Sequence, residues 1–563
     1  MLTSKNFYNS NTIGELIDNA AQRFPDRILF DSPDGCYTAL ELSKNSTKLA
    51  KILRKWKVFN GNVFVISPNS IYHPLVAYAC AKNSLAYCCC EETVPSSYWK
   101  DMITDFHVKV LVFHPMHLQK MLELKTVHKN IILICLDTLS SANELAGQTP
   151  TKDILKAFRD SKLGFSMASL MKANFNDDLI ELPPVSSTSP VVLSFTSGTS
   201  GGGIYKAVTF THENLLYITP PPPLFDKEVK RIDSLGWSWF TGVRVLFSTV
   251  SQGQTHLIRH SHLGTMSYID QHIYYKTEKF TTNNRRLFEI CYSTPEQIRE
   301  LKKHCKAIVY TGEKASRKLI MDAIKVLCPE ISLIQYYGAT ETSAMGCMLS
   351  AEDHNAALTN PTEKNLKRLE SVGKPELGVK VRVINEEGTD CAPGEKGSII
   401  FRTPSMTPGY YNNPEKNSSL FINGWINIGD VGSLDEDGYL YVYGRKNEDE
   451  IYTGHTRLNA VHLQNSVALV DGVQESVAAV ARINGLATLV LFVAEEPNCR
   501  FSKDEMKARI ITQVNADFSK GNRPERIYIL SSFPVSKISE KVLKHVLIKD
   551  LELGKDIESI KYN

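Results

Sequence analysis

Hydrophobic positions in the first part of the chain follow two different spacings. In residues 11–25, apolar side chains recur every three or four positions after the polar residue Thr12, which is typical of a capped amphipathic helix. The segment Asn62–Pro68 is instead a short apolar run, as in a buried strand. The same patterns predict helices at 38–56 and 73–83, and strands at 85–90, 108–114, 130–136 and 190–195. Strands that alternate with helices predict an α/β domain with mainly parallel sheets.

The pattern changes after Gly373. Pairs of short strands, such as 379–385 and 398–402, are joined by glycine-rich turns, which predicts a β-rich subdomain over 373–445. A charged stretch at 446–450 follows, and we expect it to be a linker. We therefore expect an N-terminal domain over residues 1–445 and a smaller α+β domain over 446–563.

Two segments interrupt this regular alternation. Residues 141–189 are polar and poorly periodic, and we expect them to form a long surface excursion. Residues 220–223 are four consecutive prolines, which cannot form a helix because proline lacks a backbone N–H.

Composition excludes several classes of protein. A chain of 563 residues is too long for one hydrophobic core, and its formal charge of +3 does not suggest a nucleic-acid partner. No apolar run is long enough to span a membrane, and the N-terminus lacks the apolar core of a signal peptide. The 12 cysteines include a run at 88–90 but no Cys-x-x-Cys pair. We expect buried thiols in a reducing, cytoplasmic compartment, without a zinc site.

The segment 194–208 has the composition of a phosphate-binding loop. It combines glycines, four hydroxyl side chains between Thr196 and Ser200, and the cation of Lys206. Glycine lets the backbone turn tightly, and successive N–H groups in such a loop can bind an anion. It is not the common Gly-x4-Gly-Lys-Ser/Thr loop, because alanine follows Lys206. The alternative is a flexible surface loop of similar composition.

Three further stretches carry groups suited to a nucleotide. Residues 335–342, Gln-Tyr-Tyr-Gly-Ala-Thr-Glu-Thr, follow a predicted strand and offer an aromatic ring, hydroxyls and a carboxylate. Asp430 and Arg445 lie in glycine-rich segments and could bind ribose hydroxyls and a phosphate. Residues 534–544 carry three lysines near the C-terminus.

These four stretches resemble, in order and in approximate spacing, the signature motifs of the adenylate-forming superfamily. That family contains acyl- and aryl-CoA synthetases, luciferases and the adenylation domains of nonribosomal peptide synthetases. The resemblance implies a large N-terminal domain and a small mobile C-terminal domain that enclose ATP, Mg²⁺ and a carboxylate. The carboxylate would attack the α-phosphate to give an acyl-adenylate, and a thiol of CoA or of a phosphopantetheinylated carrier protein would then accept the acyl group.

The resemblance also implies roles for individual residues. Glu341 would bind Mg²⁺, Tyr337 would stack on adenine with Gln335 and Gly312 at its edge, and Asp430 would bind ribose with Arg445 beside it. Lys541 would be the catalytic lysine, whose ammonium neutralises charge that develops at the α-phosphate. The complete expected ATP site is Thr196, Ser197, Gly198, Thr199, Ser200, Gly201, Lys206, Gly312, Glu313, Gln335, Tyr336, Tyr337, Gly338, Thr340, Asp430 and Arg445.

The chain departs from the family pattern in several places, two of which concern the predicted phosphate loop and the predicted catalytic lysine. The phosphate loop has extra residues, 202–205, before Lys206. Near the C-terminus the glycine before the catalytic lysine is missing and the register is shifted, so Lys541 is chosen over Lys537 and Lys544 because Lys541-Val-Leu-Lys544 matches the family's pattern. The resemblance therefore supports transfer of the acyl group to a thiol less well than it supports formation of the adenylate.

The segment from Asp233 to Phe240 bears on the carboxylate substrate. It resembles the segment of amino-acid adenylation domains in which an aspartate binds the substrate's α-ammonium, a charge-assisted pair. The alternatives are a solvated aspartate that caps a helix and aromatic rings that pack in the core. The residues expected to bind the substrate are Asp233, Trp237, Thr311, Tyr336 and Ala344. Two bulky aromatics among them leave room for a small side chain, which favours glycine first and alanine second.

No carrier or condensation segment is apparent, which favours a stand-alone ligase that loads a separate carrier protein. This layout is similar to the glycine-activating ligases of bacterial lipid A aminoacylation, and to D-alanine-activating cell-wall ligases. One alternative is an acyl- or aryl-CoA synthetase, and another is a catalytically weak relative that acts as a binding protein. The sequence does not indicate the oligomeric state.

Overall fold

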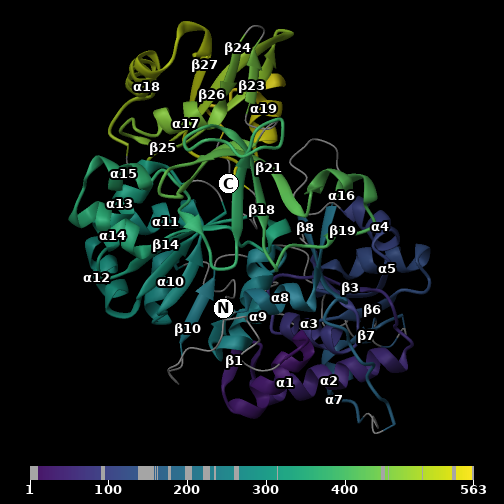
Figure 1. Ribbon diagram of the computed structural model, residues 1–563. Coiled ribbons are helices and arrows are strands. Elements are labelled where there is room, and N and C mark those ends of the chain that lie inside the picture. The colour runs from purple at the N-terminus through teal and green to yellow at the C-terminus, as the bar shows by residue number, and fades with distance from the viewer. Residues whose placement is uncertain are drawn as a thin grey trace.

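The computed structural model of the protein has a small C-terminal group of elements on top of a larger body (Figure 1). The structure describes residues 10–90, 96–136, 158, 160, 163–174, 179–196, 206–219, 229–233, 236–258, 266–312, 315–445, 450–453, 456–497, 499–535 and 541–560. No helix among these residues has the length and hydropathy needed to cross a membrane.

The first large sheet has the strand order β19-β9-β8-β4-β3-β5-β6-β7. Its strands are parallel except at one edge, where β9 runs antiparallel to both β8 and β19. The strands are β3 (Asn62–Ile66), β4 (Ala86–Cys90), β5 (Val108–Phe113), β6 (Ile132–Cys135), β7 (Phe165–Ser166), β8 (Pro190–Thr196), β9 (Lys206–Thr211) and β19 (Gly409–Tyr410).

The second large sheet has the order β16-β15-β14-β13-β12-β10-β11-β1-β2 and is parallel from β14 to β1. The strands are β1 (Ile28–Ser32), β2 (Gly35–Thr38), β10 (Lys230–Asp233), β11 (Thr255–Leu257), β12 (Lys279–Thr282), β13 (Ala307–Tyr310), β14 (Ser332–Tyr337), β15 (Cys347–Leu349) and β16 (Lys374–Pro375). These two sheets confirm the predicted α/β class with mainly parallel sheets.

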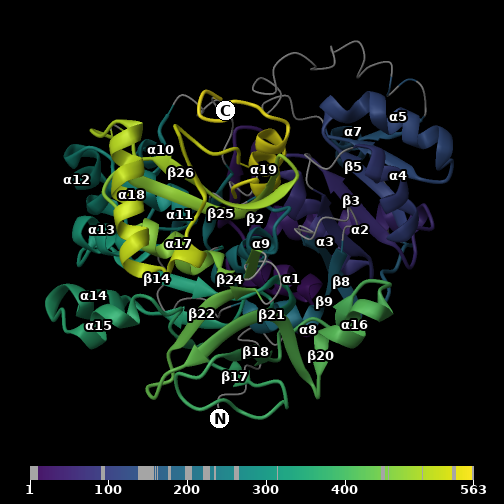
Figure 2. The ribbon, with the colours of Figure 1, turned by 90° about the horizontal axis from the view of Figure 1, so that it is seen from above.

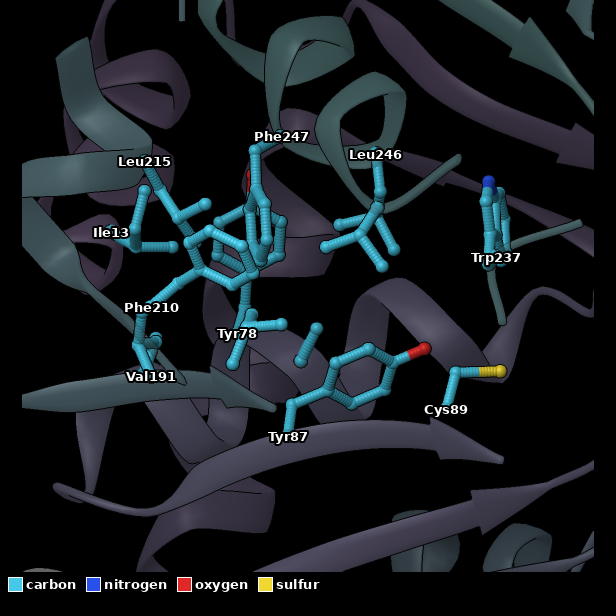
Figure 3. Close-up of a cluster of buried hydrophobic side chains, with 14 of the residues drawn as sticks. Ile13, Tyr78, Tyr87, Cys89, Val191, Phe210, Leu215, Trp237, Leu246 and Phe247 are labelled. Carbon is cyan, nitrogen blue, oxygen red and sulfur yellow. The ribbon is translucent and has the colours of Figure 1, made fainter. Parts of the chain in front are cut away.

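Helices cover both faces of each large sheet, and one group lies between the sheets. Helices α1 (Ile13–Arg23), α3 (Tyr72–Lys82) and α9 (Phe240–Gln252) contribute to the central hydrophobic cluster, in which Tyr78, Phe210 and Phe247 pack together (Figure 3). The remaining helices of the large body are α2 (Ala39–Lys55), α4 (Ser96–Asp105), α5 (Leu118–Val127), α7 (Met167–Lys172), α8 (His212–Ile218), α10 (Tyr268–Tyr274), α11 (Asn284–Cys291), α12 (Pro295–His304), α13 (Arg317–Leu327), α14 (Ala351–Thr359), α15 (Glu363–Arg368) and α16 (Pro414–Leu420), with short 3-10 turns at Pro115–His117 and Thr340–Thr342.

The third sheet is antiparallel and confirms the predicted β-rich region. Its order is β17-β18-β21-β20, with β22 paired to β21. Seen from above, β17, β18, β21 and β22 lie together at one side of the molecule (Figure 2). The strands are β17 (Lys380–Ile384), β18 (Gly397–Arg402), β20 (Phe421–Ile422), β21 (Trp425–Leu434) and β22 (Leu440–Arg445).

The C-terminal elements have hydrophobic clusters of their own, built from residues 458 onward. They contact the large body through Glu496, which accepts hydrogen bonds from the Tyr292 hydroxyl at 2.9 Å and from the Lys318 ammonium. The elements are β23 (Glu450–Thr453), β24 (Thr456–Asn459), α17 (Ala460–Val467), β25 (Val473–Ile483), β26 (Leu486–Glu495), α18 (Lys503–Asp517), β27 (Arg526–Leu530) and α19 (Lys544–Glu552), with a 3-10 turn at Lys520–Asn522.

Some element predictions need correction. The segment 141–189 is not only a polar surface excursion, because its described part contains β7, α7 and the fully buried side chain of Met167. The buried thiols of residues 88–90 are as expected, but Cys36 is exposed. The prolines at 220–223 and most of the predicted linker, 446–449, lie outside the described residues.

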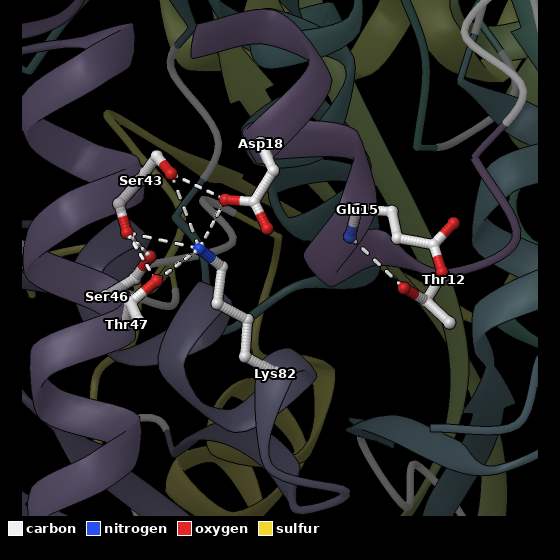
Figure 4. A network of polar contacts seen from close by, with 7 residues as sticks. All are labelled: Thr12, Glu15, Asp18, Ser43, Ser46, Thr47 and Lys82. Atoms are coloured by element: carbon white, nitrogen blue, oxygen red, sulfur yellow. Dashed lines mark hydrogen bonds and ion pairs between the residues drawn. The ribbon is translucent and has the colours of Figure 1, made fainter. Parts of the chain in front are cut away.

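A buried lysine joins the first three helices. The Lys82 ammonium at the end of α3 donates hydrogen bonds to the Asp18 carboxylate at 2.5 Å and to the Thr47 hydroxyl at 2.8 Å (Figure 4). It also donates to the backbone carbonyl of Ser43 at 3.1 Å. Burial lowers the pKa of Lys82, and the negative charge of Asp18 opposes that effect. The partners compensate for removing the ammonium from water.

A buried histidine fixes the N-terminus of α1. The Nδ1 atom of His212 accepts the backbone N–H of Ile13 at 3.0 Å, so the ring must be neutral with its proton on Nε2. The His212 side chain is fully buried, and burial lowers its pKa to about 4. The unfolded chain binds a proton near pH 6.5, so stability is lost as the pH falls from 6.5 toward 4.

We predict that His212→Asn reduces the loss of stability between pH 7 and pH 5 by about 2 kcal/mol, the value expected for a histidine whose pKa falls from 6.5 to about 4. Asparagine keeps an acceptor for the Ile13 N–H but does not titrate. Urea unfolding at both pH values measures the change. His545→Asn at an exposed position is the control and should keep the wild-type pH dependence. An unchanged pH dependence in His212→Asn would contradict the assignment.

Candidate functional site

The carboxylate of Glu341 lies at the junction of the two large sheets. It sits in the 3-10 turn Thr340–Thr342 directly after β14, and its backbone carbonyl accepts the N–H of Thr407 at 2.9 Å. The hydroxyl of Tyr410, in β19 of the first sheet, donates to Glu341 Oε1 at 2.6 Å. Burial, and then the charge of Glu341, raises the pKa of Tyr410 above its ordinary value.

A second tyrosine–carboxylate pair joins the second and third sheets. Tyr337, the last residue of β14, donates its hydroxyl to Asp430 Oδ2. Asp430 on β21 pairs across the strands with Arg445 on β22, whose Nε lies 3.3 Å from Asp430 Oδ1. Burial, and then the charge of Asp430, raises the pKa of Tyr337. The structure thus brings together three residues that were predicted to bind the adenosine part of ATP.

The phosphate loop is described only at its two ends. Residues Ser197, Gly198, Thr199, Ser200 and Gly201, together with Glu313, lie outside the described residues. Thr196 and Lys206 are directly paired at the ends of β8 and β9, so the loop joins two adjacent antiparallel strands. The Lys206 ammonium lies 5.7 Å from the ring centroid of Tyr410, which places the end of the loop beside Glu341.

Of the two glycines at this edge of the second sheet, Gly312 borders open space and Gly338 does not. Gly312 has φ +105°, and a Cβ atom there would meet no other atom within 4 Å. Gly338 is the opposite case, because a Cβ atom there would lie 2.9 Å from the backbone of Ala344. Hydroxyl, carboxylate and guanidinium groups beside open backbone suit a nucleotide with its Mg²⁺. Among the described residues, no cluster of three or more histidine, cysteine, aspartate or glutamate side chains could hold a metal ion.

Gln335 was predicted at the edge of adenine, and the structure corrects that placement. Its side chain is 3% exposed and accepts a hydrogen bond from the Tyr310 hydroxyl at 3.4 Å. Tyr310 in turn contacts His354 Nε2 at 2.8 Å. The low exposure and the contact with Tyr310 place the Gln335 amide in the core.

Trp237 was predicted to line the substrate pocket, and this prediction is also wrong. The side chain is 1% exposed, and its ring packs against those of His73 and His256 at centroid distances of 5.3 Å and 5.5 Å. A third contact, edge to face, is made with Phe30. A ring buried on all sides is part of the core, so one of the two aromatics that indicated a small pocket does not restrict it.

The other predicted substrate residues gather around an arginine that sequence reasoning missed. The Thr311 hydroxyl donates to the backbone carbonyl of Tyr336 at 2.9 Å. The guanidinium of Arg244, on α9, lies 5.7 Å from the Tyr336 ring centroid and donates to the carbonyl of Ala344 at 3.3 Å. Arg244 also lowers the pKa of Glu376, which burial raises more strongly. Arg244 is the only charged residue of the largely buried helix α9, and this was the available signal.

Asp233 is described only as backbone. It ends β10 and pairs with Thr281 of β12, so it lies at the carboxyl edge of the second sheet, the edge to which β13 and β14 bring Thr311 and Tyr336. Its side chain lies outside the described residues.

Lys541 reaches the large body. Its Nζ lies 5.5 Å from the ring centroid of Trp239, which directly precedes α9. Of the two other candidate lysines, Lys537 lies outside the described residues and Lys544 is the first residue of α19. Lys541 thus comes from the C-terminal elements to the segment that begins at Asp233.

Sequence comparisons find relatives among enzymes that are named as ligases. The 2-succinylbenzoate–CoA ligase of Listeria monocytogenes serotype 4b is 26% identical over 403 residues, which span 68% of this chain and 75% of the relative. The enzyme of the same name from Oceanobacillus iheyensis is 29% identical over 221 residues, but the match spans only 41% of its length. The fatty acid–[acyl-carrier-protein] ligase ScoC of Streptomyces coeruleorubidus is 28% identical over 240 residues, or 43% of its length.

Solved structures share the whole fold at low sequence identity. The amide bond synthetase McbA of Marinactinospora thermotolerans has a TM-score of 0.75 and 17% identity, over 96% of this chain and 99% of that one. The O-succinylbenzoate coenzyme A synthetase MenE of Bacillus subtilis, in complex with AMP, has a TM-score of 0.70 and 20% identity, over 94% and 97% of the two chains. A sequence model of the AMP-binding enzyme family matches residues 17–411. Because that match spans more than half of the chain, the protein belongs to the family of AMP-binding enzymes and is an ATP-dependent, AMP-forming ligase.

Proposed function

We propose that the protein activates a small amino acid, glycine first and alanine second, as an aminoacyl-adenylate and transfers it to the phosphopantetheine thiol of a separate carrier protein. The observation that carries the adenylation step is the convergence of Glu341, Tyr337, Asp430 and Arg445 at the meeting point of three sheets. The carboxylate oxygen attacks the α-phosphorus, pyrophosphate leaves, and the thiol then displaces AMP.

Each group of this site has a distinct task in the proposed reaction. Asp430 and Arg445 hold the ribose, and Tyr337 stacks on adenine. Glu341 would hold Mg²⁺, which would supply positive charge for the phosphates. Thr340 and the phosphate loop from Thr196 to Lys206 bind the phosphates. Lys541 places its ammonium where negative charge grows between the carboxylate and the α-phosphate. Residues 446–563 act as a mobile lid that brings Lys541 to this position.

The choice of an amino acid rests on Asp233. Its backbone lies at the same sheet edge as Thr311 and Tyr336, where an aspartate can pair with an α-ammonium. A carrier-protein acceptor is supported by ScoC, a relative named as an acyl-carrier-protein ligase. The preference for a small side chain now rests on Tyr336 alone among the aromatics, because Trp237 is in the core.

A second candidate is an acyl- or aryl-CoA ligase. The relatives named 2-succinylbenzoate–CoA ligase favour it, and so does Arg244. A guanidinium beside Tyr336 and Ala344 suits an acyl group that carries a negative charge or an aromatic face.

Pyrophosphate exchange with a panel of carboxylates separates the two candidates. We expect exchange with glycine or alanine, and we expect Asp233→Asn to reduce it roughly hundredfold because the ammonium loses its charged partner. Asp31→Asn, at an exposed aspartate of β1 in the same sheet, should keep full activity. Exchange only with fatty or aryl acids would overturn the amino-acid proposal and support the second candidate.

The choice of catalytic lysine has its own test. We expect Lys541→Ala to slow adenylation about 10²–10³-fold, as for removal of one electrostatic donor from a transition state. Lys544→Ala, on the same segment, should change the rate little. A Lys537→Ala variant that loses activity while Lys541→Ala keeps it would move the role to Lys537. Single-turnover formation of the adenylate measures each rate.

A further inference from the structure

The short strand β19 brings Tyr410 between two parts of the ATP site. Tyr410 pairs with Val208 of β9, two residues after Lys206. Its backbone is held on the other side by Asn417, whose Oδ1 accepts the Tyr410 N–H at 2.7 Å and whose Nδ2 donates to the Tyr410 carbonyl at 3.0 Å. A backbone bonded on both sides leaves the phenol ring little freedom to shift.

Close contacts of the residues before Tyr410 fix the path of the backbone that leads to it. Gly409 has φ +138°, and a Cβ atom there would lie 2.8 Å from the Asn417 side chain, so glycine is required. The Thr407 hydroxyl accepts the Gly409 N–H at 3.0 Å, and the Thr407 N–H donates to the carbonyl of Glu341 at 2.9 Å. The turn that carries Tyr410 is therefore bonded to the backbone of the residue that the phenol contacts.

The phenol side chain of Tyr410 contacts Glu341 through its hydroxyl and lies near Lys206 through its ring. Its hydroxyl donates to Glu341 Oε1 at 2.6 Å, and its ring lies 5.7 Å from the Lys206 ammonium. Within the part of the chain that the structure describes, no other side chain donates a hydrogen bond to the Glu341 carboxylate. One oxygen of that carboxylate is thus fixed by Tyr410, which sets the direction of the other.

We propose that Tyr410 is a positioning residue that holds the Glu341 carboxylate for the Mg²⁺–ATP complex and aligns it with Lys206 at the end of the phosphate loop. The proposal rests on the proposed role of Glu341 as the Mg²⁺ ligand. Hydrogen-bond donors that orient a metal-binding carboxylate commonly change metal affinity tenfold or more when removed. Tyr410 therefore acts on the metal complex of ATP and not on metal-free ATP.

The test is calorimetric binding of ATP to the full chain, with excess Mg²⁺ and with EDTA. We expect Tyr410→Phe to weaken binding of Mg²⁺–ATP roughly tenfold and to leave binding of metal-free ATP unchanged. Tyr411→Phe is the matched control: its hydroxyl contacts His107 at 3.3 Å and lies outside this pair, so both affinities should stay at the wild-type value. Equal weakening of both forms by Tyr410→Phe, or no weakening, would overturn the proposal.

Glu341→Gln separates failure of this inference from failure of the proposed function. If Glu341→Gln binds Mg²⁺–ATP as tightly as the wild type, the metal role of Glu341 is wrong and the inference falls with it. If Glu341→Gln weakens binding and Tyr410→Phe does not, only the positioning role is wrong. If both act through one carboxylate, the double variant should lose no more affinity than Glu341→Gln alone.

Discussion

The site depends on two hydrogen bonds in which a tyrosine hydroxyl holds a carboxylate from another part of the fold. Tyr410, in the first sheet, donates its hydroxyl to Glu341, which lies in the turn that follows β14 of the second sheet. Tyr337, in the second sheet, donates its hydroxyl to Asp430, which lies in the third sheet. Bonds from a hydroxyl to a carboxylate are short and strong, and these two lie where the three sheets meet. Small relative shifts of the sheets would therefore misplace both carboxylates.

The negative charges of Asp430 and Glu341 have cations near them that come from several elements of the fold. Arg445 compensates Asp430 across a strand pair, and Lys206 approaches Glu341 through the Tyr410 ring. Lys541, from the C-terminal elements, lies over the ring of Trp239, which precedes α9. Cations around two carboxylates favour a ligand that carries negative phosphates and binds Mg²⁺, because each charge then has a partner when water is excluded.

Predictions from local pattern succeeded where one short segment contains the whole signal. Thr12 caps α1 through the N–H of Glu15, as its position before the apolar spacing indicated. Predictions about which side chains line the substrate pocket failed at Trp237 and missed Arg244, because a pocket is made by side chains from separate elements. A tryptophan in a motif segment can lie on either face, and here His73, His256 and Phe30 surround it.

The sequence by itself determined the α/β class, the β-rich region, the family and the segments that supply the nucleotide-binding groups, because periodicity and motif spacing are properties of contiguous residues. Only the tertiary structure decided that Gln335 points into the core with Tyr310, and that Tyr410, outside the recognised motifs, contacts Glu341 from 69 residues away. Such contacts depend on how sheets pack and on which face each side chain takes, and neither is encoded in a local pattern.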